Sequence, residues 1–422
     1  MADPIVRSAL NWTGHLRRGP PLQLRAEIDN VFSHEKKMRT VILVAVTLVG
    51  VAQAFGPAIA GLKARAPHDE ARATAGQAGN PHMSMHAVTI APNESAHRVD
   101  IAIGGRPFTS YIWPERVKKP VLDPIRSAKG IVVTRGWPLD PRPGERVDHP
   151  HHVGLWFNYE SVNGVDFWNN SDALKPDDAA RMGAIVHRRI VSANGGAERG
   201  QLVTESDWVL PGGKTVLHER TEFVFSGDES TRTIDRSATL TALDARVVFA
   251  DVKDGMLGMR VARQLEQPST EPLVFTDIAG RATAVPVMDN TGVTGEYTSS
   301  EGRKGDAVWG TRGEWTKLSG TIGSDAITIA MIDHPKNPGF PTYWHARGYG
   351  LFAANPLGQK VFSEGRETLN FTIEPRASAT FRYRVVVFDG TATPERLERE
   401  FARFALGPTT RSNQPAGPGR AQ

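Results

Sequence analysis

The chain has 422 residues, enough for one large or two ordinary domains with a sizeable apolar core. It carries 50 Lys and Arg residues against 46 Asp and Glu residues, a net charge of +4. No basic run is interleaved with aromatic residues, so nucleic acid is excluded as an expected partner. Cysteine is absent, which excludes disulfides, thiolate metal sites, iron–sulfur clusters and a cysteine nucleophile.

The N-terminal region has the three-part layout of a secretory signal peptide at residues 38–60. The basic stretch HEKKMR precedes an uncharged apolar run, and small residues then follow in an A-x-A arrangement. We expect Met38 to be the natural start, which leaves residues 1–37 as an extension from a misassigned start codon. The alternative is an uncleaved membrane anchor that extends through Leu62. Both interpretations predict an exported protein, periplasmic or secreted, that meets a membrane only through this segment.

The rest of the chain is predicted to be a linker, a strand-rich domain and a tail. Residues 61–94 are rich in Ala, Gly and polar residues without an apolar period, which is typical of a flexible linker. From residue 95 to 406, short segments alternate apolar and polar residues between Gly- and Pro-rich turns, and no helical pattern alternates with them. We therefore predict an all-β fold, one large antiparallel β-sandwich, with a disordered tail over residues 407–422. The expected strands are RVDIAI, RPFTSYIW, AIVHRRIVSA, RGQLVTESDWVL, KTVLHERTEFVF, ARVVFADV, PLVFTD, AITIAMID, TLNFTIEP and TFRYRVVVFDG.

One helix is predicted near the C-terminal end of the domain. Thr393 is a suitable N-cap and Pro394 suits the first helical position. Leu397, Phe401 and Phe404 then recur at helical spacing, so the helix is expected to pack its apolar stripe on a sheet.

The stretch DHPHHVGLWF, residues 148–157, gathers three histidines and an aspartate around one proline. Imidazole transfers protons near neutral pH and also binds metals, so this clustering predicts a functional site. In an extended segment His149 and His151 would share a face and His152 would point the other way. Pro150 places the stretch at a strand entry, an edge or a loop, with VGLWF as the strand that follows.

A second stretch, DHPKNPGFPTYWHARGYGLFAANPLG at residues 333–358, repeats this style and contains Asp333 and His345. The two stretches are expected either to face each other across one cleft or to be unrelated loops.

Aromatic and polar residues surround the first stretch. Flat indole rings beside amide and carboxylate groups suit a sugar, because its C–H face stacks and its hydroxyls form hydrogen bonds. Arginine suits a ligand carboxylate or hydroxyl, although most such arginines lie at the surface. The candidates are Trp113, Trp137, Trp156, Trp168, Asp166, Asn169, Asn170 and Arg135.

The chain resembles the PmoA-like, or "methane oxygenase PmoA", domain family over about residues 95–390. The resemblance rests on the signatures DHPHH-x-GLW and DFW within residues 108–171, on DGMLGMRVA and on residues 333–358. It implies an exported bacterial β-sandwich protein of unestablished activity. It also implies a supersandwich similar to galactose mutarotase-like aldose-1-epimerases, in which histidine and carboxylate pairs move protons at the anomeric carbon.

These patterns favour a carbohydrate-active enzyme, an epimerase, lyase or hydrolase acting on a sugar or uronate. His151 or His152 is expected to transfer a proton while Asp148 orients the imidazole. His345 or Asp333 would be the second group. The substrate-binding residues are expected to be Trp156, Trp168, Asn169, Asp166 and Arg135.

Three other interpretations remain open at this stage. The first is a non-catalytic sugar-binding module, which needs the aromatic platform but no titrating pair. The second is the metal-dependent oxygenase that the family label suggests, with a divalent metal on His149, His151 and His345. The third is a purely structural envelope protein. The favoured interpretation needs no cofactor, and its partner is a small-molecule or oligosaccharide ligand.

Overall fold

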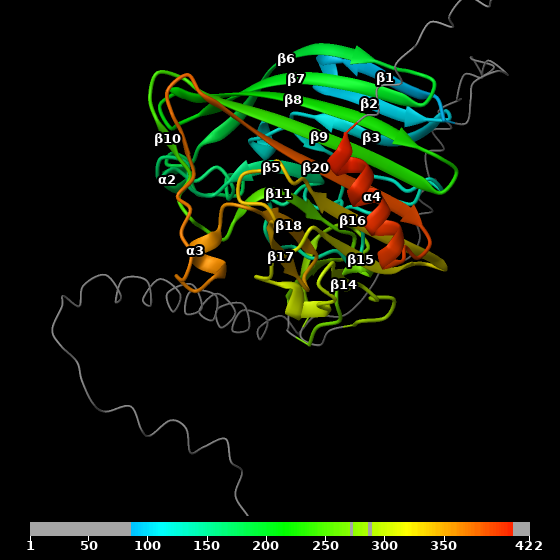
Figure 1. Ribbon diagram of the computed structural model, residues 1–422. Coiled ribbons are helices and arrows are strands. Elements are labelled where there is room, and N and C mark those ends of the chain that lie inside the picture. The colour runs from blue at the N-terminus through cyan, green and yellow to red at the C-terminus, as the bar shows by residue number, and fades with distance from the viewer. Residues whose placement is uncertain (1–85, 271–272, 286–288, 408–422) are drawn as a thin grey trace, which may run out of the picture. The chain divides into compact units, whose positions relative to one another are not determined.

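Alternating apolar and polar residues build two large antiparallel sheets that pack face to face (Figure 1). The computed structural model describes residues 86–270, 273–285 and 289–407, which all belong to one compact unit spanning residues 77–422. The predicted N-terminal extension, the signal peptide or anchor, most of the linker and the tail after Gly407 lie outside the described residues.

The first sheet carries the histidine stretch. Its eight strands run in the order β1-β2-β3-β4-β5-β11-β18-β17, so the strand after the histidines, β5, lies in the middle beside β11. The bounds are β1 (Val88–Asn93), β2 (Arg98–Ile103), β3 (Arg106–Ile112), β4 (Val121–Leu122), β5 (Leu155–Tyr159), β11 (Gly255–Arg260), β18 (Leu351–Asn355) and β17 (Tyr343–Arg347).

The second sheet also has eight strands and contains the longest ones, in the order β14-β15-β16-β20-β9-β8-β7-β6. The bounds are β14 (Glu296–Ser299), β15 (Trp315–Ile322), β16 (Asp325–Asp333), β20 (Ser378–Asp389), β9 (Thr231–Ala242), β8 (Thr215–Gly227), β7 (Arg199–Val209) and β6 (Ala184–Asn194).

Smaller elements complete the domain. Two short pairs join β10 (Val247–Val248) to β19 (Thr372–Ile373) and β12 (Leu273–Thr276) to β13 (Ala282–Val285). The α-helices among the described residues are α2 (Pro176–Ala179), α3 (Gln359–Phe362) and α4 (Pro394–Leu406), and none of them is long and apolar enough to cross a membrane.

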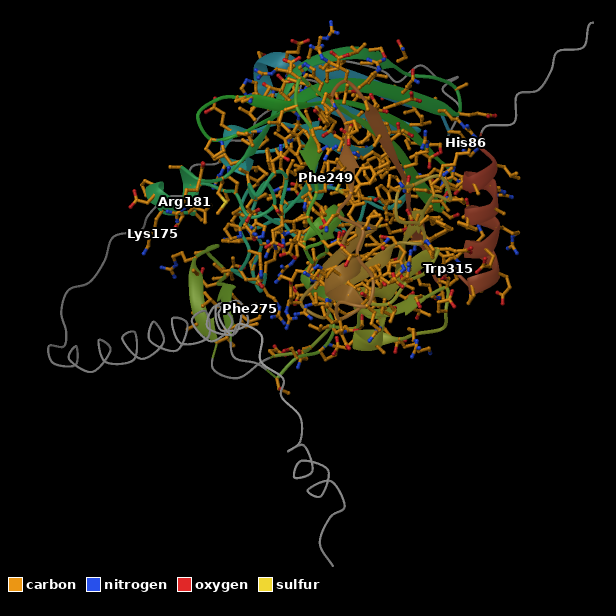
Figure 2. The ribbon with its side chains drawn as sticks, turned by 60° about the vertical axis from the view of Figure 1, so that its left-hand side comes forward. His86, Lys175, Arg181, Phe249, Phe275 and Trp315 are labelled. Atoms are coloured by element: carbon orange, nitrogen blue, oxygen red, sulfur yellow. The ribbon has the colours of Figure 1, made fainter. Side chains whose placement is uncertain are left out.

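The main core fills the space between the two sheets. On β5, Leu155, Phe157 and Tyr159 point into this space, whereas Trp156 lies on the opposite face, as the two-residue period of a strand requires. Figure 2 shows Phe249 of the main core among densely packed side chains.

A second apolar layer covers the outer face of the first sheet. Its buried members are Val117, Val121, Val153, Trp156, Trp168, Leu351 and Ala353. Gly258 of β11 lies beneath the two indoles of this layer. A Cβ atom at Gly258 would come within 2.5 Å of the Trp156 ring and 2.9 Å of the Trp168 ring. The lack of a side chain at this position is therefore what allows both rings to approach the strand so closely.

Helix α4 closes the outer face of the second sheet (Figure 1). The Thr393 side chain accepts a hydrogen bond from the Arg396 backbone N–H and so caps the first turn. Leu397 and Phe404 pack with apolar residues of β15, β16 and β20. The predicted helix is confirmed, and so is the predicted all-β sandwich.

The strand pattern differs from the prediction at its margins. Strand β1 (Val88–Asn93) lies in the segment expected to be linker, so the ordered sandwich begins earlier than residue 95. The segments ARVVFADV and TLNFTIEP pair only through two residues each, Val247–Val248 with Thr372–Ile373.

We predict that Gly258→Ala lowers the free energy of unfolding by about 1–3 kcal/mol, because the new methyl group forces two buried indoles to move. The measurement is chemical denaturation of the domain. Gly348→Ala is the matched control, because its Cβ meets only the flexible end of the Gln267 side chain at 2.9 Å. Equal stability of the two variants would contradict the packing described here.

Candidate functional site

The histidine stretch forms a tight turn directly before β5. His149 adopts a left-handed backbone conformation with φ of 44°, and the His152 N–H donates to the His149 carbonyl at 2.9 Å. The rings of His149 and His152 therefore stack, with centroids 4.8 Å apart and planes at 2°, while His151 stands at 76° to His152. The prediction that His149 and His151 share a face was wrong, because the chain turns at Pro150 instead of running extended.

The two parallel imidazoles belong to a longer stack of rings. Tyr349 stacks on His149 with centroids 5.0 Å apart, and Trp156 stacks on the other side of His152, also at 5.0 Å. Trp168 meets the Trp156 ring edge-on at 5.3 Å. At most 1% of the surface of either tryptophan is exposed, and the two rings form the floor beneath the histidines. The structure therefore does not place Trp156 and Trp168 at the surface, where they were expected to hold a substrate ring.

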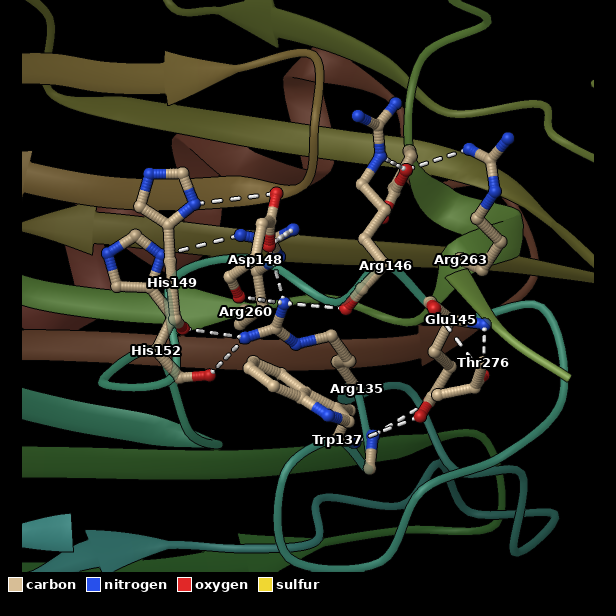
Figure 3. A network of polar contacts seen from close by, with 12 residues as sticks. Arg135, Trp137, Glu145, Arg146, Asp148, His149, His152, Arg260, Arg263 and Thr276 are labelled. Carbon is tan, nitrogen blue, oxygen red and sulfur yellow. Dashed lines mark hydrogen bonds and ion pairs between the residues drawn. The ribbon is translucent and has the colours of Figure 1, made fainter. Parts of the chain in front are cut away.

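Two buried arginines hold the turn in place (Figure 3). Arg135 Nη1 and Arg260 Nη2 both lie 2.7 Å from Asp148 Oδ1. Arg135 also donates to the backbone carbonyls of Asp148, His149 and His152, at 2.8, 2.9 and 2.9 Å. The Arg135 guanidinium is thus occupied by the protein itself, and its contacts give it a structural role in shaping the turn.

The charges of this group are fixed by burial and proximity. Burial raises the pKa of Asp148, but Arg260, the hydrogen bond with His149 and Arg135 together hold that pKa well below its usual range. Burial and the charge of Arg260 lower the pKa of Arg135 to about 9, so the guanidinium remains protonated at neutral pH. One carboxylate therefore lies between two buried cations.

His151 and His152 are uncharged bases. Burial is the largest cause that lowers the pKa of both imidazoles well below the usual value, and neighbouring positive groups act in the same direction. Arg260 Nη1 lies 3.4 Å from His152 Nδ1, and because arginine only donates, this contact places the His152 proton on Nε2. Among the described residues, none bonds to the buried Nε2 atom of His151 or of His152.

Lys119 lies against the same turn. Its ammonium donates to the His151 carbonyl at 2.8 Å and lies 5.7 Å from the centre of the Trp156 ring. Burial lowers the pKa of Lys119 to about 7, against a smaller opposing effect of Asp166. A large fraction of this amine is therefore neutral at physiological pH.

The second predicted stretch reaches the site through His345 and Tyr349. His345 lies on β17, and its Nδ1 atom lies 3.0 Å from the Lys253 carbonyl and 3.3 Å from Asp254 Oδ1. Both neighbours are acceptors, so Nδ1 carries the proton and Nε2 keeps a free lone pair. Burial, with the charge of Arg347, lowers the pKa of His345 to about 3.

Tyr349, in the turn that follows β17, stacks on His149, and so brings the second stretch against the histidine turn. The two sequence stretches therefore do meet on one face of the sheet. Asp333 does not take part. It lies on β16 of the other sheet, where its carboxylate accepts from Asn337 Nδ2 at 2.7 Å and from the Thr342 N–H at 2.8 Å.

Carboxyl groups surround these bases. Burial, followed by the charges of Asp254 and Asp166, raises the pKa of Glu160 to about 7, and burial also raises the pKa of Asp254. Asp166 accepts from the backbone N–H groups of Trp168 and Asn169 and from Asn169 Nδ2, at 2.7, 3.0 and 2.8 Å. Asp166 and Asn169 therefore hold their own loop together, with both side chains half-buried.

Several residues of this site were not singled out from the sequence. Lys119, Glu160 and Asp254 lie in ordinary strand-and-turn contexts, and nothing in their neighbours marks them. Their altered pKa values arise from burial by segments distant in the chain.

A metal centre does not fit the described residues. No group of three or more His, Asp or Glu side chains in the described ranges has a geometry that could hold a metal ion. His149, His151 and His345, the ligands considered from the sequence, do not form such a group in the described ranges.

The family of unknown function DUF6807 has a model that matches residues 98–402. The chain belongs to this family. The finding corrects the resemblance to the PmoA-like domain family, because the DHPHH and DFW signatures that suggested it lie inside the DUF6807 match. The family label therefore no longer supports the oxygenase interpretation.

No curated protein sequence matches the chain. Among solved structures, it is similar to a proposed aldose 1-epimerase from Escherichia coli K12 (12% identity, 72% of this chain and 99% of that chain, TM-score 0.26). It is similar to the Slr1438 protein from Synechocystis sp. PCC 6803 (11% identity, 72% of this chain and 96% of that chain, TM-score 0.26). It is also similar to the GH36 alpha-galactosidase AgaB from Geobacillus stearothermophilus (10% identity, TM-score 0.32), covering 72% of this chain and 41% of that one. Function is therefore inferred from the residues of the site alone.

We predict that Asp148→Asn destabilises the fold by about 3–5 kcal/mol at pH 7, because it leaves two buried guanidiniums without a counter-charge. Because the pKa of Asp148 is lower in the folded than in the unfolded state, its stabilisation is full above the unfolded value of about 3.9. The difference between wild type and variant must shrink as the pH falls from there through the folded-state pKa.

Denaturant unfolding at several pH values measures this difference. The matched control is Asp207→Asn, whose carboxylate pairs with the exposed Arg188 and His218, and which is expected to cost about 0–1 kcal/mol. A loss at Asp148 no larger than the loss at Asp207 would show that the buried charge group contributes little to stability.

We also predict that His151, His152 and His345 stay neutral from pH 8 to about pH 5, because burial lowers their pKa values below the usual 6.5. Ring-nitrogen NMR spectra of the domain, assigned with single His→Gln variants, measure this directly. They should report a protonated Nδ1 in His345 and a protonated Nε2 in His152. Titration of any of the three between about pH 6 and 7.5 contradicts the prediction.

Proposed function

We propose that this chain is an exported enzyme that moves protons on a sugar or a uronate by histidine and carboxylate acid–base chemistry. The observation that carries the proposal is a set of nitrogen bases on one face of the sheet, His151, His152, His345 and Lys119, whose pKa values burial lowers. A neutral imidazole accepts a proton from a substrate carbon or hydroxyl without first losing one.

His345 is the best placed base. The Lys253 carbonyl and the Asp254 carboxylate hold its Nδ1–H, so the Nε2 lone pair has a fixed direction. A carboxylate that orients an imidazole in this way also stabilises the imidazolium formed when the base takes its proton. Asp254 therefore acts as the orienting residue, the task assigned from sequence to Asp148.

Glu160 is the complementary acid. Its pKa of about 7 lets it hold a proton at neutral pH and release it to a leaving oxygen or a carbanion. His151 is a second proton-transfer group, because its Nε2 atom is buried beside the turn without a described partner. Asp148 does not contact the substrate. It is a positioning residue that holds Arg135 and Arg260 beneath His151 and His152.

The export component of the proposal is supported by the N-terminal sequence, where an apolar run follows a basic stretch and precedes an A-x-A arrangement. A periplasmic or extracellular location suits an enzyme that meets sugars released from polysaccharides.

The test is a substrate screen in D2O with aldoses, uronates and their oligomers. NMR detects deuterium uptake at carbon, ultraviolet absorbance detects unsaturated uronates, and new reducing ends report hydrolysis. We predict that His345→Gln lowers kcat by about 100-fold or more on any substrate found, which is the usual contribution of a general base. His218→Gln, an exposed histidine on β8 of the other sheet, is the matched control and should stay within about twofold of wild type.

Full activity of the His345→Gln variant would overturn the assigned base. Binding of sugars without any turnover would favour a sugar-binding module. Elemental analysis of protein purified without chelator or nickel completes the test. If wild type contains stoichiometric metal and the His151→Ala variant does not, the histidines form a metal site, and acid–base catalysis by free histidines is overturned.

A further inference from the structure

An exposed tryptophan lies next to His345. Trp309 follows the short helical turn Gly305–Val308, and 37% of its surface is exposed, whereas the tryptophans of the site floor are fully covered. Its ring meets the His345 ring at 76° with centroids 6.4 Å apart, and it meets Phe362 edge-on at 5.6 Å. Trp309 therefore has the accessible indole that stacking on a sugar ring requires, a role predicted from the sequence for Trp156 and Trp168.

Arg347 lies over the same indole. It is two residues after His345 on β17, so both side chains project from the same face of the strand, and its guanidinium lies 5.2 Å from the centre of the Trp309 ring. The side chain is exposed, and no carboxylate in the described part of the chain forms an ion pair with it. Other exposed arginines, such as Arg366 and Arg376, do face a carboxylate.

The hairpin turn after Arg347 joins this pair to the histidine stack. The Gly350 N–H donates to the Arg347 carbonyl at 2.9 Å, and Tyr349 in the same turn stacks on His149. Trp309 and Arg347 therefore lie on the accessible margin of the site, at the edge strand β17 and beside the base His345.

We infer that Trp309 and Arg347 form a binding subsite for a uronate, a pyranose that carries a carboxylate, and this inference rests on the function proposed above. The open part of an indole face stacks with the C–H face of a pyranose, and a guanidinium fork binds a carboxylate through two parallel hydrogen bonds. An exposed guanidinium that lacks a protein counter-charge favours an anionic sugar over a neutral one. Lys253, also exposed and next to Asp254, adds positive charge on the same side.

The subsite also suits the chemistry of the base. Adjacent outward positions on a strand are about 6.6 Å apart, so a carboxylate held by Arg347 brings the neighbouring C5–H towards His345. The guanidinium neutralises the carboxylate, which makes that C–H more acidic. When Nε2 of His345 takes the C5 proton, the remaining electron pair either accepts a proton on the opposite face, as in epimerisation, or forms a C4–C5 double bond. In the second case O4 leaves with a proton from Glu160.

The experiment is calorimetric titration of the full domain with trimers of galacturonate, glucuronate and mannuronate, each beside its carboxyl-reduced neutral counterpart. We expect wild type to bind at least one uronate trimer about tenfold or more tightly than its reduced form. Arg347→Ala should abolish this preference while leaving affinity for the neutral trimer unchanged, and Arg347→Lys should restore part of it. Trp309→Ala should weaken both trimers by about tenfold, with Trp309→Phe in between.

Arg189→Ala is the matched control, because Arg189 is exposed on β6 of the other sheet and pairs with Glu205. It should leave every affinity within about twofold, and thermal melts of all variants confirm that they are folded. Equal affinity for uronate and neutral trimers, or an unchanged preference in Arg347→Ala, overturns the subsite while turnover by wild type leaves the proposed function standing. If no trimer binds to wild type, the subsite is overturned, whereas the proposed function falls only if the substrate screen with aldoses, uronates and their oligomers also finds no turnover.

Discussion

The site depends on one carboxylate between two buried guanidiniums. Asp148 neutralises Arg135 and Arg260, and the neutralised Arg135 is then free to hold three backbone carbonyls of the histidine turn. Without the carboxylate, two cations would repel each other in a region from which water is excluded, and the turn would lose its geometry. The stacking of His149 on His152 follows from this arrangement, because it fixes the backbone turn that carries both rings.

Burial acts in opposite directions on the two kinds of titratable group around this turn. It lowers the pKa values of His151, His152 and His345, and it raises those of Glu160 and Asp254. At neutral pH the three imidazoles are therefore unprotonated, while Glu160, with a pKa of about 7, still holds its proton in part of the molecules. That combination is rarely stable in water, where an acid of ordinary strength would have transferred its proton to an imidazole.

The sequence was sufficient to predict the sandwich and the C-terminal helix, because strand alternation and helix capping are local signals. It also singled out the histidine stretch, but it left open whether residues 333–358 meet that stretch or form an unrelated loop. The predicted directions of the His149, His151 and His152 side chains were wrong. The sequence does not reveal the left-handed backbone conformation of His149, and this conformation decides which rings stack. The sequence analysis favoured Asp333 because it belongs to a DHP motif. The actual partner of His345 is Asp254, which is 91 residues away in the chain, so only the packing reveals it. Lys119, Glu160 and Trp309 escaped notice for the same reason.

The hairpin between β17 and β18 has a consequence for how such a protein can diversify. Arg347 and Tyr349 occupy a short turn whose two glycines, Gly348 and Gly350, carry no side chains into the site. The groups that set protonation, by contrast, are embedded in the sandwich and its arginine pair. Under the proposal above, exchange of the exposed Arg347 alone can alter which ligand is admitted, whereas Tyr349 is tied to His149 and Arg260. Recognition and reactivity thus lie in separate parts of the hairpin region, and a substitution at position 347 can change the first without the second.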